Sequence, residues 1–242
     1  MPSVEEHYTR LLAPHYSWIC GGAEGQLEAH RAFFARHAVQ PGNGGVALDL
    51  GAGPGFQSIP LAELGFRVIA IDLSGDLLDE LRRIAGDLPI TTRQDDLRHF
   101  SRHSPGQVEL IVCMGDTLTH LNTLREVKTL INRIARALAS GGRLFLAFRD
   151  MSKAAEDLDR FIAVRSDADR IFTCFLEFEK RHVKVHDLVY IRSADQWALK
   201  KSYFRKLRIA KDWLETQILK SGLNLEHGDT EKGMTTIIAR KS

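Results

Sequence analysis

A glycine-rich loop that directly follows a short apolar run constrains the fold of this chain more than any other segment. The run Val46–Leu50 leads into Gly51-Ala52-Gly53-Pro54-Gly55, in which glycines occupy alternate positions. Glycine permits positive φ angles and has no Cβ, so a ligand can lie against the backbone. A helix expected to begin near Gln57 directs unpaired N–H groups toward the same space, which favours a carboxylate or a phosphate. The loop therefore predicts a strand–loop–helix unit that binds a ligand.

Apolar runs of strand length alternate with segments of helical period between Val46 and Arg149, which is the pattern of βαβ units. Ser74 is expected to cap one helix, and Thr123 with Glu126 fits a capping box for a helix that stops at Gly141–Gly142. We expect parallel strands over Val46–Leu50, Arg67–Ile71, Ile90–Arg93, Glu109–Cys113 and Arg143–Phe148. A helix over Asp212–Lys220 and two final strands, Leu223–Asp229 and Met234–Ala239, follow later in the chain.

Beyond Asp167 the apolar residues alternate with polar ones, which is the period of a half-buried strand. Three such runs, separated by short polar turns, predict an antiparallel meander over Ile171–Glu179, Val183–Arg192 and Trp197–Leu207. A chain of 242 residues is long for one core and short for two full domains. We therefore expect a single domain over residues 1–242, with a helical cap over residues 1–45 and an antiparallel insert or lid over residues 151–208.

Composition restricts the class of protein. Hydrophobic residues make up 44% and charged residues 26% of the chain, as in soluble globular proteins. A net charge of +2 is too small for the broad basic surface of a dedicated duplex binder. No apolar stretch is long enough to cross a membrane, and the first twenty residues lack the apolar run of a signal peptide, so we expect a cytoplasmic protein without a membrane partner.

An acid follows the second expected strand at the spacing of a ribose-binding carboxylate. Asp72 lies 72 − 51 = 21 residues beyond Gly51, where a distance of ~20 residues is expected. A dinucleotide fingerprint would need its third glycine three residues after Gly53, and Phe56 occupies that position. The loop thus suits a nucleotide cofactor other than a dinucleotide better.

These motifs resemble those of the class I S-adenosylmethionine-dependent methyltransferases. Asp49-Leu50-Gly51-Ala52-Gly53-Pro54-Gly55 looks like their first motif, and Asp72-Leu73 looks like the end of their second strand. Gln94-Asp95-Asp96-Leu97 resembles the segment that faces adenine, which implies that role for Asp96 and Leu97, with Asp95 as the alternative. The resemblance implies a doubly wound Rossmann-like, mostly parallel seven-stranded sheet with an inserted three-stranded antiparallel sheet after the fifth strand, and S-adenosylmethionine as cofactor.

Cys113-Met114-Gly115-Asp116 is similar to the fourth motif of small-molecule N-methyltransferases of the glycine N-methyltransferase type. That family commonly has Asn where this chain has Asp116. The resemblance implies a cofactor site that comprises Tyr16, Asp49, Gly51, Ala52, Gly53, Gly55, Asp72, Leu73, Asp96, Leu97, Met114 and Gly115.

Candidate acceptor residues come from loops and strands over the same sheet edge. His120 could act as a base or as a donor, and Tyr203 could share that catalytic role. Tyr16 and Trp18 could close over the cofactor as an aromatic lid. Trp18, Asp116, Arg149 and Arg205 are the expected acceptor-binding residues. The pairs His99/His103 and His182/His186 lack a third ligand, so we expect no metal site.

The function expected from these residues is S-adenosylmethionine-dependent methyl transfer to a nitrogen or oxygen atom of a small-molecule acceptor. Methylation of an RNA nucleotide, as in tRNA, is the alternative within the same chemistry. A NAD-dependent oxidoreductase and a non-catalytic S-adenosylmethionine-binding protein are the alternatives from other classes. We also expect a homodimer formed through the inserted sheet.

Overall fold

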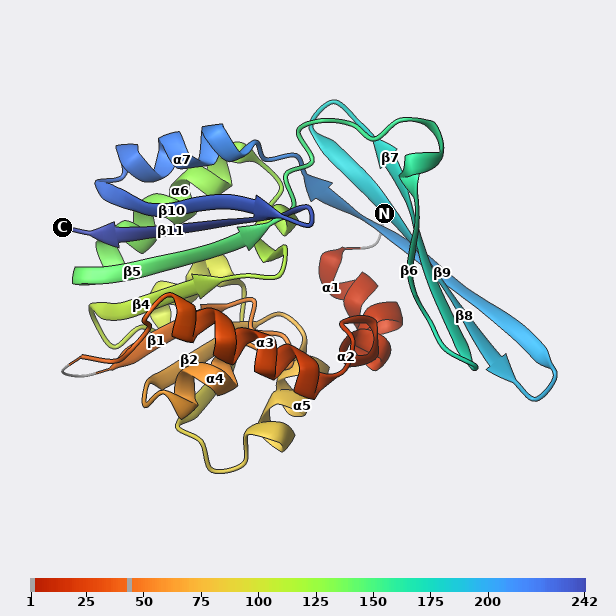
Figure 1. Cartoon of the computed structure of the whole chain (residues 1–242), viewed down its shortest axis with the longest axis horizontal. Helices are drawn as coiled ribbons and strands as arrows, with labels where there is room; N and C mark the ends of the chain where they lie inside the picture. Colours follow the sequence, from red (N-terminus) through yellow and green to blue (C-terminus); the bar gives the residue numbers. More distant parts are fainter. Residues whose placement is uncertain (1–2, 43–44) are drawn as a thin grey trace.

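The computed structural model describes residues 3–42 and 45–242, which form two sheets joined by helices (Figure 1). The larger sheet has seven strands in the order β10-β11-β5-β4-β1-β2-β3. Strands β1 to β5 pair in parallel with their neighbours, and β11 runs antiparallel between β5 and β10. The strands are β1 (Val46–Leu50), β2 (Arg67–Asp72), β3 (Ile90–Gln94), β4 (Val108–Cys113), β5 (Leu138–Phe148), β10 (Leu223–Glu231) and β11 (Met234–Lys241). The expected doubly wound, mostly parallel seven-stranded sheet is confirmed.

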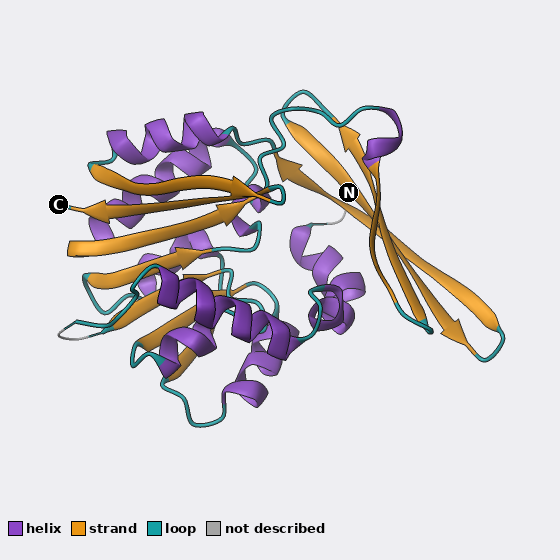
Figure 2. Cartoon of the chain, in the orientation of Figure 1, coloured by secondary structure: helices purple, strands orange, loops and turns teal. Residues whose placement is uncertain are grey.

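Helices cover both faces of this sheet, as Figure 2 shows. Aliphatic side chains of β1 and β4 are buried on both sides, so the sheet needs a helical layer on each face. One layer consists of α6 and α7, and the other consists of α3, α4 and α5. The bounds are α3 (Ala23–Arg36), α4 (Ser58–Glu63), α5 (Gly75–Ala85), α6 (Leu124–Ala137) and α7 (Lys211–Lys220).

Both predicted helix caps are present. The hydroxyl of Ser74 accepts a hydrogen bond from the Leu77 backbone N–H at 3.3 Å. Thr123 and Glu126 form a reciprocal capping box at the start of α6. The predicted end of that helix at Gly141–Gly142 is wrong, because α6 ends at Ala137 and β5 begins at Leu138. The two glycines lie inside β5, beside an irregular register where Val108 still pairs with Leu138.

The inserted sheet has four strands, and the predicted number of three is wrong. It comprises β6 (Phe161–Ser166), β7 (Arg170–Phe178), β8 (His182–Ser193) and β9 (Gln196–Leu207), paired antiparallel in that order. The three expected strands correspond to β7, β8 and β9. The sequence did not predict β6 as a strand. Its apolar residues are consecutive and all its residues are exposed, so it lacks the alternation of a half-buried strand.

Short N-terminal helices lie between the two sheets (Figure 1). They are α1 (Val4–His7), a π-helical turn η1 (Tyr8–Leu12), a 3-10 turn η2 (Ala13–His15) and α2 (Tyr16–Ile19). Leu11 and Leu12 pack on Phe172 and Val189 of the inserted sheet. His7 is buried and its Nε2 lies 2.8 Å from the carboxylate of Asp187 on β8. The N-terminal segment therefore joins the inserted sheet to the rest of the molecule. Across the two described ranges, no helix is both long and apolar enough to span a bilayer.

The capping box of α6 gives a test of the local fold. Thr123→Ala removes the hydroxyl that accepts the Glu126 N–H, and such losses lower the free energy of unfolding by about 1 kcal/mol. Urea denaturation followed by circular dichroism measures the change. Thr129→Ala is the matched control, because Thr129 is exposed in the middle of the same helix and only bonds the carbonyl of Arg125. Equal losses in the two variants would contradict the capping role.

Candidate functional site

The glycine loop after β1 is shaped by its neighbours at two positions and open at the third. Gly51, Gly53 and Gly55 all have positive φ, at 79°, 52° and 89°. A Cβ on Gly51 would lie 2.2 Å from Thr117 Cγ2, and one on Gly55 would lie 2.1 Å from Leu81 Cδ1. At Gly53 the nearest atom is Tyr16 Cε1, 3.8 Å away. Packing thus requires Gly51 and Gly55, whereas Gly53 leaves free space for a ligand.

Asp72 connects this loop to the end of β2. Its carboxylate accepts the Gly53 N–H and the Ser74 N–H, each at 2.8 Å. Burial raises the pKa of Asp72, although these backbone donors oppose the shift. The acid predicted to bind ribose hydroxyls is therefore held at the edge of the loop, facing the same space.

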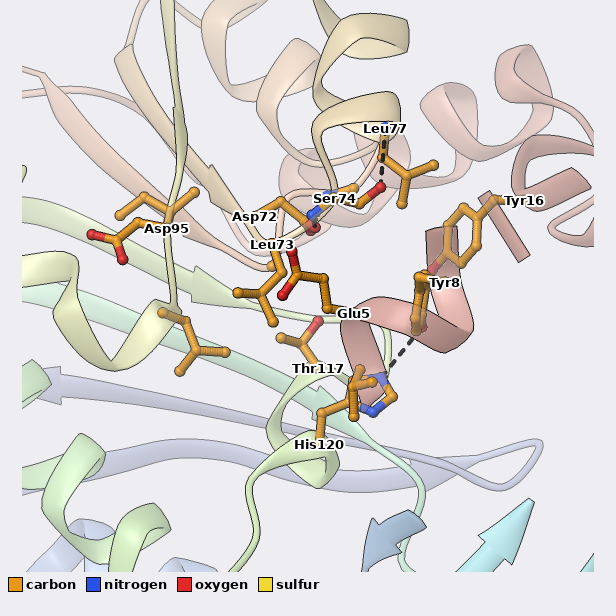
Figure 3. Close-up of a pocket in the computed structure, with 15 residues that line it drawn as sticks. Glu5, Tyr8, Tyr16, Asp72, Leu73, Ser74, Leu77, Asp95, Thr117 and His120 are labelled. Atoms are coloured by element: carbon orange, nitrogen blue, oxygen red, sulfur yellow. Dashed lines mark hydrogen bonds between the residues drawn. The ribbon is translucent and has the colours of Figure 1, made fainter. Parts of the chain in front are cut away.

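A cavity in two connected parts follows the loop, and we call it the loop cavity. Its first part, about 80 Å³, is drawn in Figure 3 and runs past Asp72, Leu73, Asp95 and Leu97 toward His120. Its second part, about 290 Å³, extends past Ala52 and Pro54 to Met114 and Gly115. Tyr16, Gly51 and Gly53 line both parts. The carboxyl ends of β1, β2, β3 and β4 therefore meet around one elongated space, as expected for an open parallel sheet.

A larger cavity of about 530 Å³, here called the sheet cavity, lies between the N-terminal helices and the inserted sheet. Tyr8, Tyr16 and Gly115 line both this cavity and the loop cavity, so the two meet at these residues. Apolar side chains form most of its wall on the inserted sheet. They are Ile162, Val164, Phe172, Leu176, Val185 and Phe204.

Asp116 lies beside this junction, in the left-handed region with a φ of 77°. It is only 2% exposed, and its carboxylate accepts hydrogen bonds from the Arg149 guanidinium at 2.6 Å and the Lys206 ammonium at 2.7 Å. Burial would raise the pKa of this carboxyl, but the two cations outweigh burial and hold the pKa of Asp116 well below its usual range. The cluster of Asp116, Arg149 and Lys206 therefore carries one net positive charge.

His120 is paired with Tyr8 on the other side of the junction (Figure 3). The Tyr8 hydroxyl lies 3.3 Å from His120 Nε2, and His120 Nδ1 is buried without a partner among the described residues. Burial and the nearby Lys206 charge lower the pKa of His120 to about 3. Burial also raises the pKa of Tyr8 far above its usual value. Both side chains are therefore neutral at physiological pH, and a hydrogen bond joins the Tyr8 hydroxyl to His120 Nε2.

Most residues predicted to bind the cofactor line the loop cavity, and three, Asp49, Gly55 and Asp96, lie elsewhere. Gly51, Ala52, Gly53, Asp72, Leu73, Leu97, Met114, Gly115 and Tyr16 line it. Asp49 lies beneath the loop, fully buried, and its carboxylate accepts the Ser58 hydroxyl at 2.6 Å. Burial raises the pKa of Asp49 to about 7. Gly55 packs on Leu81 rather than on the cavity.

The two acids after β3 lie at two neighbouring cavities. Asp95 lines the loop cavity, and its carboxylate lies 2.7 Å from His103 Nε2. Asp96 instead caps the 3-10 helix η3 (Leu97–Arg102) and pairs with the Arg98 guanidinium at 2.6 Å. Asp96 lines a neighbouring cavity together with Leu73 and Leu97, so the assignment of the adenine edge to Asp96 or Asp95 stays a prediction.

On the acceptor side, Asp116 and Arg149 line the sheet cavity as predicted, and three other residues do not. Trp18 lies under the guanidinium of Arg170, with the two groups 4.4 Å apart, at the inserted sheet. Tyr203 stacks on His186, and Arg205 pairs with Glu179 at 2.9 Å. The alternate residues of β9, Phe204 and Lys206, face the cavity instead. Both faces of β9 carry an aromatic and a cation, so the sequence alone did not distinguish them.

Sequence reasoning also missed Tyr8. The only available signal was an aromatic residue in a segment expected to form the N-terminal cap.

Residues 47–142 match the family model described as a methyltransferase domain. A glycine/sarcosine N-methyltransferase of Parasynechococcus marenigrum is 33% identical over 133 residues, or 54% of this chain and 47% of that protein. The crystallised CcbJ methyltransferase of Streptomyces caelestis superposes with a TM-score of 0.79 at 18% identity, covering 98% of this chain and 99% of that one. This chain carries a class I S-adenosylmethionine-dependent methyltransferase domain.

Similarity in sequence is concentrated in that domain. The putative methyltransferase YqeM of Bacillus subtilis is 31% identical over 149 residues, which cover 60% of this chain and 60% of that protein. The chain thus spans about half the length of the curated relatives that it matches. A solved S-adenosylmethionine-dependent methyltransferase of Clostridium acetobutylicum, with a TM-score of 0.76 at 16% identity over 97% of this chain and 99% of that one, shares the fold.

The loop cavity of the methyltransferase domain fits S-adenosylmethionine. A Cβ on Gly53 or Gly115 would project into free space, so both glycines keep the backbone open to a ligand. Asp72, predicted to bind the ribose hydroxyls, lines this cavity, as do Asp95 and Leu97 from the segment predicted to face adenine. When bound, the cofactor supplies an activated methyl group on a sulfonium.

The depressed pKa of His120 predicts a pH-dependent stability. His120 takes up a proton near pH 6.5 in the unfolded chain but only near pH 3 in the folded one, so its contribution to stability is lost as pH falls below 6.5. From pH 7 to pH 5, the wild type should lose about 2 kcal/mol of unfolding free energy relative to His120→Asn, which lacks the titrating ring. Urea titrations of both proteins at each pH measure this. A difference that stays constant with pH would contradict the assignment.

Proposed function

We propose that this protein transfers the methyl group of S-adenosylmethionine to a nitrogen or oxygen atom of a small-molecule acceptor. The observation that carries the proposal is the junction at Tyr8, Tyr16 and Gly115, where the cofactor-sized loop cavity meets the sheet cavity. A methyl group at that junction would face a partly open, mostly apolar space. Such a space suits a small molecule better than a nucleic acid strand.

The chemistry needs alignment more than proton transfer. Methyl transfer is an in-line displacement in which the sulfonium is already a good leaving group, so positioning and water exclusion can supply most of the rate. A base with a pKa near 3 has little tendency to take a proton at neutral pH. We therefore assign His120 a positioning role: its hydrogen bond with the Tyr8 hydroxyl fixes that ring at the junction.

Names of the relatives support a small-molecule acceptor. They include N-methyltransferases named for glycine and sarcosine and O-methyltransferases named for ubiquinone biosynthesis. Neighbours in structure include an amino pentose methyltransferase and a sugar N-methyltransferase. Nitrogen and oxygen acceptors thus both occur among proteins similar to this one. The expected cytoplasmic location stays part of the proposal.

The melting temperature of the protein, measured with and without added ligand, tests the identity of the cofactor. Saturating S-adenosylhomocysteine should raise the melting temperature by several degrees, and NAD should not, because a ligand that binds only the folded state stabilises it. Gly53→Ala should remove most of that shift by filling the loop cavity. A shift with NAD alone would favour an oxidoreductase.

The matched control is Gly86→Ala. Gly86 has a φ of 56°, close to the 52° of Gly53, and no atom within 4 Å of its Cβ position. Both variants therefore place a side chain at a positive φ, but only one lies at the cavity.

Radiolabelled S-adenosylmethionine offered with small-molecule extracts and with tRNA then separates a small-molecule enzyme, an RNA enzyme and a binding protein.

The expected homodimer rests on the outer face of the inserted sheet. Phe161, Phe175, His186 and Tyr203 form a row of ring contacts across its four strands, at 4.7, 5.7 and 5.4 Å between successive centroids. Ile171, Tyr190 and Leu199 lie side by side in the strand register. Glu177 and Lys184 supply both signs of charge on the same face, so two copies related by a two-fold axis would be complementary.

Light scattering after gel filtration tests this dimer. Leu199→Glu places a charge within the apolar part of the outer face and should yield a monomer of half the mass of the wild-type species. Leu219→Glu is the control, because Leu219 is a similarly exposed leucine on α7, outside the inserted sheet. A wild-type monomer would refute the dimer.

A further inference from the structure

The charged end of the sheet cavity indicates which kind of acceptor it receives. Lys206 and Arg149 share a single buried counter-ion, the carboxylate of Asp116. The Lys206 side chain is 12% exposed, and its ammonium has three N–H donors, of which Asp116 accepts one. Among the described residues, Nε and Nη2 of Arg149 have no hydrogen-bond partner. The cluster thus offers several unused donors and one net positive charge to a ligand.

The cavity's other acid, Asp187, belongs to a separate hydrogen-bonded group. Asp187 lies opposite Ser202 in the strand pairing, whereas Lys206 lies opposite Val183, which precedes Asp187 by four residues on β8. At a strand rise of ~3.3 Å per residue, the two positions are about 13 Å apart. Both oxygens of Asp187 are also occupied, one by His7 Nε2 and the other by the Cys174 thiol, each at 2.8 Å. Asp187 therefore offers a ligand no free acceptor, whereas Lys206 and Arg149 offer free donors beside Asp116.

An apolar body can extend from that end along the inserted sheet. Phe172, Leu176, Val185 and Phe204 are nearly buried on the inner face of the sheet and line the cavity. A volume of about 530 Å³ exceeds what a two-carbon amino acid would fill and suits a ligand with a substantial hydrocarbon part. The donors of Lys206 and Arg149 and the apolar wall together fit a ligand with a negative charge at one end and an apolar body.

We propose, on the basis of the methyltransferase function proposed above, that the acceptor is a carboxylic acid with an apolar body, and that its carboxylate is methylated to a methyl ester. Lys206 and Arg149 bind one carboxylate oxygen at the junction, and the apolar body lies against the inserted sheet. The other oxygen remains free to attack the methyl carbon.

The step balances without a base. A lone pair of the free carboxylate oxygen forms the O–CH₃ bond while the C–S bond breaks, and its electron pair goes to sulfur. The negative carboxylate and the positive sulfonium become a neutral ester and a neutral thioether, and no proton is released. This matches a junction at which Tyr8 and His120 are both neutral and poorly suited to accept a proton. An amine acceptor would instead bring an ammonium ion toward two cations.

Binding to the protein saturated with S-adenosylhomocysteine tests the proposal. The probes are 4-phenylbutyrate, 4-phenylbutanamide and 4-phenylbutylamine, which share one apolar body and differ in the head group. Calorimetry should show the carboxylate binding about tenfold more tightly than the amide, and the amine more weakly still. A carboxylate that binds no more tightly than the amide, or no binding by any of the three probes, would overturn the proposal.

Two lysine variants separate recognition from structural damage. Lys206→Met should lower the affinity for 4-phenylbutyrate about tenfold and leave that for the amide unchanged, whereas a purely structural role would lower both alike. Lys200→Met is the control, because Lys200 shares the strand and face of Lys206 but is exposed, six residues away. It should alter neither affinity.

The product gives an independent readout. Methyl groups transferred from labelled S-adenosylmethionine to the carboxylate probe, or to acids of an extract, should be released as methanol by mild alkali, because esters hydrolyse and N-methyl groups do not. Alkali-stable methylation on nitrogen would refute the carboxylate and retain the methyltransferase function. Loss of that function itself would appear differently, as absent binding of S-adenosylhomocysteine.

Discussion

The buried carboxylate of Asp116 holds together the parts from which the site is built. It lies at the end of β4, and its two partners come from the end of β5 and from the inner face of β9. A buried carboxylate is costly unless charges and hydrogen bonds compensate it, so removing either cation would leave an unfavourable group in the interior. This requirement links the inserted sheet to the carboxyl edge of the larger sheet, beside the methyl-transfer junction.

The N-terminal helices complete that arrangement from the opposite side. Their apolar residues pack against the inserted sheet, His7 pairs with Asp187, and Tyr8 and Tyr16 stand between the two cavities. One short segment therefore contacts the cofactor space, the acceptor space and the insert. The same contacts that order this segment also cover the junction. Covering the junction excludes water from the proposed reaction, which has little need for a base.

Local signals in the sequence predicted those parts of the protein in which neighbours along the chain act on one another. The capping residues Ser74 and Thr123, the glycine loop, and Asp72 at its spacing from Gly51 all lie where the pattern placed them. Strand β6 and the true end of α6 were not predictable in this way. β6 owes its strand conformation to pairing with β7, and Gly141–Gly142 are accommodated within β5 by pairing with its neighbours.

By itself, the sequence determined the parallel sheet, the cofactor loop and the class of chemistry, because hydrophobic period and glycine spacing act over a few residues. Only the tertiary structure decided which side chains meet at the acceptor. Whether β9 turns Tyr203 and Arg205 or Phe204 and Lys206 toward the cavity depends on how the insert packs against the N-terminal helices. Whether Asp95 or Asp96 borders the cavity depends on which of them caps η3. The first is a contact between distant segments, whereas the cap of η3 is local, but either acid of the doublet can supply it. In both cases a one-residue alternation in the sequence is compatible with either outcome.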